Sequence, residues 1–99
     1  MSALPPACSL DIAGAAAQRE RYRTVGNGAN LIERGRRKLV LEVAPGVPDA
    51  TVDELVAVER ECCPFFMIRW EPEPRRFSIA VRRPEEEPAL EAVAYALDC

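Results

Sequence analysis

The stretch KLVLEVAPGVPDATVDELVAVERECC, residues 38–63, changes its hydrophobic period partway along its length. Over residues 38–44 apolar and polar side chains largely alternate, which predicts a β-strand. Over residues 52–63 apolar side chains recur at helical spacing, and Pro64 disfavours helical geometry in the residue before it. The sequence therefore places a strand directly before a helix, which indicates a mixed α+β domain.

The strand pattern and the helix pattern recur on both sides of this stretch. We expect helices over residues 11–25, 52–63 and 88–97, and hairpins that pair 29–33 with 38–44 and 65–71 with 77–81. The predicted order is helix, hairpin, helix, hairpin, helix. Two hairpins can join into one four-stranded antiparallel sheet with helices on one face, so we predict a two-layer α+β fold. The order of the strands within the sheet cannot be read from the sequence.

Two local expectations follow for the helices. Thr51 and Glu54 match a capping box, which places the start of the middle helix at about residue 52. The predicted apolar side of the first helix consists of Ala13, Ala16, Ala17 and Val25.

Size and composition limit the kind of protein. The chain has 99 residues, 48% of them hydrophobic, and a net charge of -3, so we expect a single domain over residues 1–99. Residues 1–7 contain Pro5-Pro6 and are expected to form a flexible arm. There is no apolar run of about 18 residues and no export signal, so we expect a cytoplasmic protein without a membrane partner, whose four cysteines stay reduced.

The most informative feature is the adjacent pair Cys62-Cys63 at the end of the middle helix. Glu59 lies one turn earlier, near the centre of the same apolar stripe, where a carboxylate can accept a thiol proton. The negative end of a helix disfavours a free thiolate, so the pair is poorly placed for thiol catalysis. A bound soft cation reverses that balance, because thiolates gain far more from a metal than they lose to the helix dipole.

Two sulfurs are an incomplete metal site, and the chain has no histidine. Cys8 and Cys99 are the remaining cysteines, and Cys8, at the start of the first helix, is the expected third ligand. Two or three thiolates suit a thiophilic ion such as Hg(II) or As(III), with Zn(II) as a further candidate. We therefore expect a small metal-binding or metalloid-binding domain rather than an enzyme.

Two other functions stay open. Buried cysteines often pack as small hydrophobic residues, in which case the chain is a structural or interaction module, with a homodimer as one form. Glu59 would then pair with an arginine of the first helix, such as Arg19 or Arg23. The pair could instead act as a redox dithiol, which requires at least one lowered thiol pKa. A vicinal disulfide between Cys62 and Cys63 is also possible, although it closes a strained ring.

The residues AVERECCPFF, 57–66, together with the Cys8-Ser9-Leu10 start, resemble small bacterial proteins and domains with an E-x-x-C-C-P-F core. These are associated with heavy-metal resistance, and some resemble C-terminal extensions of mercury-responsive MerR-type regulators. The resemblance implies Cys8, Cys62 and Cys63 as ligand cysteines with Glu59 beside them. This chain lacks the helix-turn-helix of such regulators, so DNA binding is not implied.

Two further segments bear on the function of the chain. Phe65 and Phe66 follow the pair directly, and strand spacing would direct one ring inward and the other outward to cover the thiols. The basic turn at residues 34–38 has no interleaved aromatic residue, so we expect no nucleic-acid partner.

Overall fold

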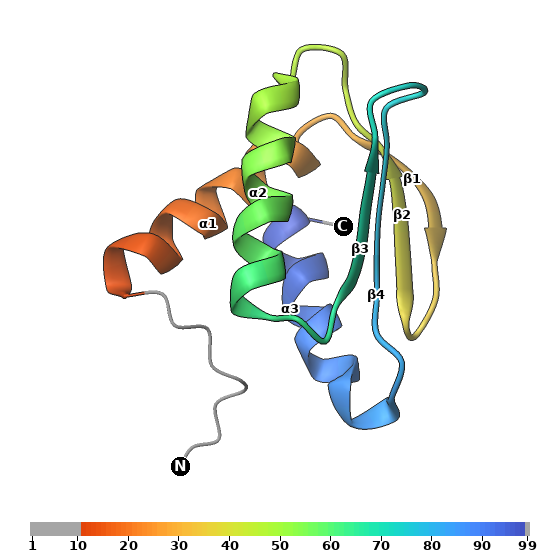
Figure 1. Ribbon diagram of the computed structural model, residues 1–99. Helices are drawn as coiled ribbons and strands as arrows, with labels where there is room; N and C mark the ends of the chain where they lie inside the picture. The colour runs from red at the N-terminus through yellow and green to blue at the C-terminus, as the bar shows by residue number, and fades with distance from the viewer. Residues whose placement is uncertain (1–10, 99) are drawn as a thin grey trace.

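The computed structural model describes residues 11–98 and confirms the predicted α+β architecture. The expected arm at residues 1–7, Cys8 and Cys99 lie outside the described residues. The elements run in the predicted order, with a short 3-10 helix added before the last helix (Figure 1). They are α1 (Ile12–Gly26), β1 (Asn30–Arg34), β2 (Lys38–Glu42), α2 (Asp49–Cys62), β3 (Met67–Glu71), β4 (Arg76–Ala80), η1 (Pro84–Glu86) and α3 (Glu87–Leu97).

The four strands form one antiparallel sheet in the order β1-β2-β4-β3. The two hairpins therefore join through β2 and β4, where Leu39 lies opposite Ile79 and Leu41 opposite Phe77. These four side chains are buried, each 2% exposed or less. The central pair of strands thus supplies the sheet side of the core and fixes the strand order that the sequence left open.

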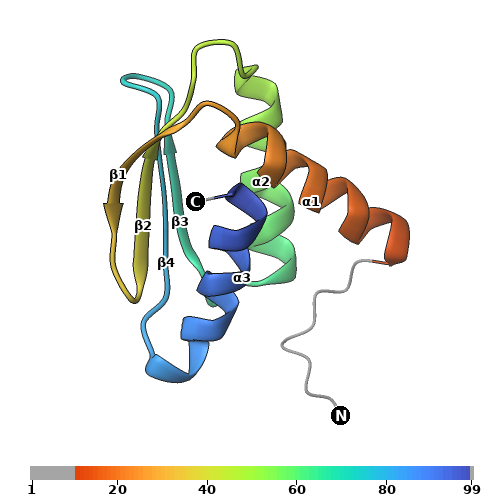
Figure 2. The same ribbon diagram turned by 180° about the vertical axis from the view of Figure 1, so that it is seen from behind.

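All three helices cover the same face of the sheet, as the opposite views in Figures 1 and 2 show. The apolar stripe of α2 is buried as predicted, with Val52 and Leu55 fully covered. Leu90 and Leu97 of α3 join the same core. No helix within residues 11–98 is long and apolar enough to span a membrane.

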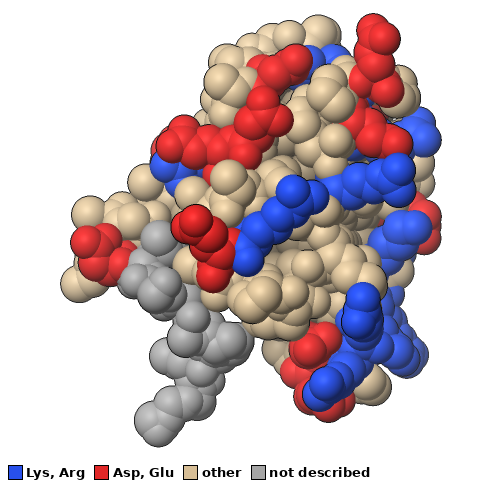
Figure 3. All heavy atoms as spheres, viewed as in Figure 1, with Lys and Arg blue, Asp and Glu red and all other residues tan. Residues whose placement is uncertain are grey.

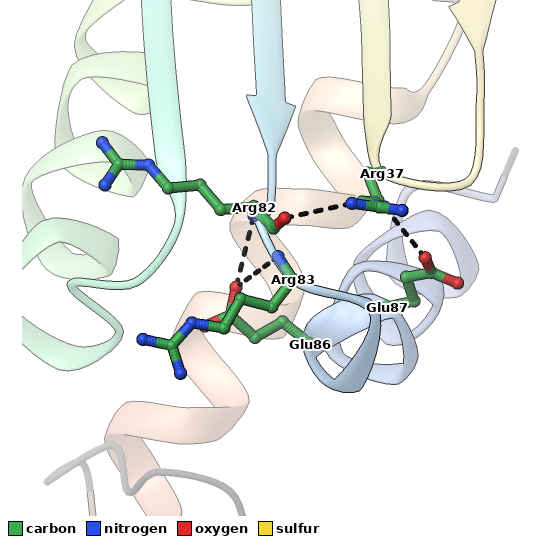
Figure 4. A network of polar contacts seen from close by, with 5 residues as sticks. All are labelled: Arg37, Arg82, Arg83, Glu86 and Glu87. Atoms are coloured by element: carbon green, nitrogen blue, oxygen red, sulfur yellow. Dashed lines mark hydrogen bonds and ion pairs between the residues drawn. The ribbon is translucent and has the colours of Figure 1, made fainter.

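The last helix is tied to the sheet by a group of charged residues (Figure 4). Arg37 of the β1–β2 turn donates to the carbonyl of Arg82 and pairs with Glu87, both over 3.1 Å. Glu86 accepts hydrogen bonds from the backbone amides of Arg82 and Arg83. The basic turn therefore has a structural role at the start of α3.

The predicted apolar side of α1 is correct for Val25 and wrong for its three alanines. The structure buries Gln18, Tyr22 and Val25, whereas Ala13, Ala16 and Ala17 are exposed. The reason is visible in Figure 1, where the first turns of α1 project beyond the sheet and only its second half packs against the other helices. The buried amide of Gln18 is satisfied because its Nε2 donates to the carbonyl of Leu55 over 3.0 Å.

The predicted capping box of α2 is also wrong. The helix begins at Asp49 after Pro48, three residues earlier than expected, and no side chain caps its first turn. Arg75, from the β3–β4 turn, donates to the carbonyls of Ala44 and Val47 and pairs with Asp49 over 2.6 Å. A long-range arginine thus organises this loop in place of a local cap.

Candidate functional site

The end of α2 carries three of the predicted site residues, with Glu59 and Cys62 on its buried face and Cys63 as the residue that ends the helix. Glu59 is 5% exposed and Cys62 is 4% exposed, and Cys63 is partly buried at the edge of the core. The helix stops at Cys62, directly before the Cys63-Pro64 step, and the Cys63 amide still donates to the carbonyl of Glu59 over 2.8 Å. The predicted stripe is therefore confirmed, with the carboxylate one turn before both cysteines.

Glu59 is held by a tyrosine rather than by the predicted arginines. The hydroxyl of Tyr22 in α1 donates to Oε2 of Glu59 over 2.5 Å, and both side chains are buried. Arg23 lies 4.0 Å from Glu20 on the exposed side of α1. The predicted partner helix was correct, but the contact comes from its polar aromatic residue.

Tyr22 is thus the site residue that the sequence analysis missed. The signal was the spacing of Gln18, Tyr22 and Val25 at i, i+4 and i+7, which marks one face of a helix. That face contains a buried amide and a buried phenol, so it looks less apolar than the alanine face. Alanine content favoured the wrong face, because alanine is tolerated equally well in water and in the core.

Cys63 is a thiol that keeps its proton. Burial raises its pKa to about 12, and the nearby Glu59 carboxylate adds to the shift by its charge and by accepting the thiol hydrogen bond. Burial, followed by the charge of Glu59, also raises the pKa of the Tyr22 hydroxyl above its usual range. Glu59 is therefore surrounded by two neutral donors that both retain their protons at neutral pH.

No lysine or arginine within residues 11–98 forms an ion pair with Glu59. The arginines of residues 11–98 form their ion pairs at the surface, where basic and acidic side chains are interspersed (Figure 3). Arg60, the next residue in α2, instead donates to the carbonyl of Ile68 over 3.3 Å. A buried carboxylate without a cationic partner is costly, and two hydrogen bonds offset only part of that cost.

The two sulfurs of the pair are in different states. Cys63 carries a titratable thiol, whereas Cys62 is disulfide-bonded and does not titrate. The vicinal disulfide is therefore not formed, and Cys62 departs from the expectation that the cysteines stay reduced. Any metal site that uses both sulfurs requires the reduced form of Cys62.

The described part of the chain does not by itself complete a metal site. Within residues 11–98, no group of three or more His, Cys, Asp or Glu side chains is arranged to hold a metal ion. Glu59 and Cys62 lie in α2 and Cys63 follows its last residue, but these three side chains are not themselves such a group. The predicted third ligand, Cys8, and its alternative, Cys99, lie outside the described residues.

Phe65 and Phe66 are placed by a turn rather than by a strand. The strand predicted from residue 65 begins at Met67, and the amide of Phe66 closes the turn by donating to the carbonyl of Cys63 over 3.1 Å. The two rings lie 4.6 Å apart between centroids at 39°, with Phe66 buried and Phe65 half-buried. Phe65 and Cys63 both pack at the edge of the core, and covering of the thiol by the rings stays a prediction.

The geometry of this site disfavours nucleophilic catalysis by Cys63. A thiol with a pKa of about 12 is almost entirely protonated at pH 7, so Cys63 is a poor nucleophile. Glu59 accepts its hydrogen bond and is positioned to take its proton when a stronger partner binds the sulfur.

Comparison of the chain with models of protein families, with curated proteins and with solved structures finds no match. The resemblance to E-x-x-C-C-P-F proteins therefore stays a prediction.

Proposed function

We propose that this protein, in its reduced form, binds a thiophilic metal or metalloid ion (Hg, As or Zn) through Cys62 and Cys63. The observation that carries the proposal is the buried Glu59, which has two neutral donors and no ion-pair partner within residues 11–98. A cation at the adjacent sulfurs would compensate this charge. The buried charge of Glu59, which destabilises the fold when it is unpaired with a cation, would then stabilise the bound ion.

Ion binding at Cys63 is coupled to proton release. The S–H bond breaks, a sulfur–metal bond forms, and the proton leaves for solvent by way of the Glu59 carboxylate, which accepts the thiol hydrogen bond and stays ionised beside the bound cation. No electron is transferred in this step. Tyr22 keeps one oxygen of Glu59 hydrogen-bonded throughout, so the carboxylate stays oriented toward the sulfur.

Cys8 completes the site in this proposal, with Cys99 as the alternative third sulfur. Two adjacent sulfurs suffice for a two-coordinate ion such as Hg(II), whereas As(III) needs a third. Zn(II) accepts sulfur and carboxylate oxygen together, so Glu59 could serve it as a ligand. The site requires reduced cysteines, which is the state expected in the cytoplasm.

The second candidate is a structural or interaction module in which these cysteines are inert. The observation that favours it is the position of Cys63, packed against the core with a pKa of about 12. The same pKa counts against the third candidate, a redox dithiol, because that function needs a thiol that ionises readily.

Native mass spectrometry of the reduced protein tests the proposal. We would offer Hg(II), As(III) and Zn(II) to the wild type and to the Cys62→Ser/Cys63→Ser variant, and to Cys8→Ser and Cys99→Ser variants, which distinguish the two candidate third sulfurs. We expect uptake of one ion by the wild type and loss of uptake in the double variant. Equal uptake by the wild type and the double variant would reject the proposal, and no uptake by either would favour the structural module.

A further inference from the structure

An open groove runs between α1 and α3 on the side of the molecule away from the sheet. The two helices approach closely at Gly26, where a Cβ would lie 2.0 Å from the carbonyl oxygen of Leu97, and they diverge from there (Figure 2). The groove is lined by Ala16, Arg19, Glu20, Arg23, Pro84, Glu87, Pro88, Glu91, Ala92, Tyr95, Ala96 and Asp98.

A large exposed apolar side chain of the helical layer lies in this groove. Tyr95 of α3 is 88% exposed and forms part of the groove wall. Ala16 and Ala92 are small, which leaves room for a large side chain from outside. An exposed apolar surface rimmed by charges is typical of an interaction site.

The two walls of the groove carry opposite charge. The α1 wall has Arg19 and Arg23 with one acidic residue, Glu20, so its net charge is +1. The charged residues of the α3 wall, Glu87, Glu91 and Asp98, are all acidic. Glu87 pairs with Arg37 and Glu91 with Arg34, so three carboxylates and two arginines leave this wall with a net charge of -1.

This arrangement is complementary to itself. A two-fold axis that runs along the groove would lay the α1 wall of one copy over the α3 wall of the other. Each basic wall would then meet the partner's acidic wall, so the contact would occur twice in the dimer, and each Tyr95 would be covered by the partner's helices. We propose that the α1–α3 groove is the interface of a homodimer formed by a second copy of this chain, independently of metal binding.

The outer face of the sheet is the weaker candidate for this role. Its exposed apolar residues Ile32 and Met67 are only 49% and 41% exposed. The edge strand β3 also carries the ion pair between Arg69 and Glu71.

Charge reversal with mixing tests the dimer. We would measure molar mass by light scattering, in reducing buffer, for the wild type, for Arg19→Glu/Arg23→Glu and for Glu91→Lys/Asp98→Lys. We expect a dimer for the wild type and monomers for each variant alone, because each variant brings like charges together. An equimolar mixture of the two variants should restore a dimer, because in the mixed pair both contacts join opposite charges.

The controls keep the outcomes distinct. Arg69→Glu/Arg76→Glu alters the sheet instead and should leave the dimer intact. A monomeric wild type, dimers in both groove variants, or variants that remain monomeric when mixed would overturn the proposal. Loss of the dimer in the sheet variant alone would place the interface on the sheet and would likewise overturn it. Because the readout is molar mass without added metal, failure here leaves the proposed metal binding unaffected.

Discussion

The hydroxyl of Tyr22 reaches across from α1 to a carboxylate in the buried face of α2, over 2.5 Å. A buried carboxylate without a cation depends on such donors. From the sequence, Glu59 was placed near the centre of the apolar stripe, and the structure buries it there. Its partner could not be predicted, because the rotation of α1 about its own axis depends on how the helix packs and not on its local composition.

Removing the Tyr22 hydroxyl should therefore destabilise the fold. We expect Tyr22→Phe to lower the free energy of unfolding by about 1–3 kcal/mol, because one oxygen of a buried carboxylate loses its donor. Urea denaturation measures this difference. The matched control is Tyr95→Phe, at a position 88% exposed, which should change stability little. Equal effects of the two variants would show that the buried hydrogen bond does not stabilise the fold.

The thiol of Cys63 should respond to the charge of Glu59. At neutral pH we expect slow alkylation of Cys63 by iodoacetamide, because its pKa is raised to about 12 and little thiolate is present. Glu59→Gln removes a negative charge that raises this pKa, so the pKa should fall and alkylation at pH 8 should become faster. Peptide mapping by mass spectrometry follows the rate at this cysteine. A wild-type rate equal to that of the unfolded chain, or a slower rate in Glu59→Gln, would contradict the assignment.

At the scale of elements, the hairpins and helices could be predicted because their hydrophobic periods are clear and their breaks carry Pro, Gly or Asn. The start of α2 could not be predicted, because Thr51 and Glu54 form a local capping pattern while the loop before the helix is organised by Arg75 from a distant turn. The prediction that the alanine side of α1 packs against the protein was wrong for a similar reason. Whether an alanine is covered depends on what packs against its helix.

The contact between α1 and α3 rests on Gly26. Its Cβ position lies 2.0 Å from the Leu97 carbonyl oxygen, so Gly26→Ala must push the two helices apart. We expect a loss of about 1–3 kcal/mol in the free energy of unfolding, the usual cost of overpacking. Gly46→Ala is the control, because nothing lies within 4 Å of its added methyl group. Thermal or urea unfolding of the two variants should differ clearly, and similar stabilities would show that the helices can shift without cost.

At the scale of the whole molecule, one helical layer and one open sheet enclose a single core, and the site lies at the end of α2. The strand order β1-β2-β4-β3 joins the hairpins at their second strands. Local sequence patterns specify each hairpin, but they do not specify which strand of one hairpin pairs with which strand of the other. The strand order therefore required the structure. The third sulfur of the site is equally a matter of long-range placement, since Cys8 and Cys99 are far from the pair in sequence.

The central claim is that the sulfurs of Cys62 and Cys63 bind a metal ion when the protein is reduced. X-ray absorption spectroscopy of the reduced protein with one equivalent of Zn(II) tests it most directly. We expect two or three sulfur neighbours at about 2.3 Å, and fewer in the Cys62→Ser/Cys63→Ser variant. A zinc environment of oxygen alone in the wild type, or sulfur neighbours unchanged in the double variant, would contradict the claim.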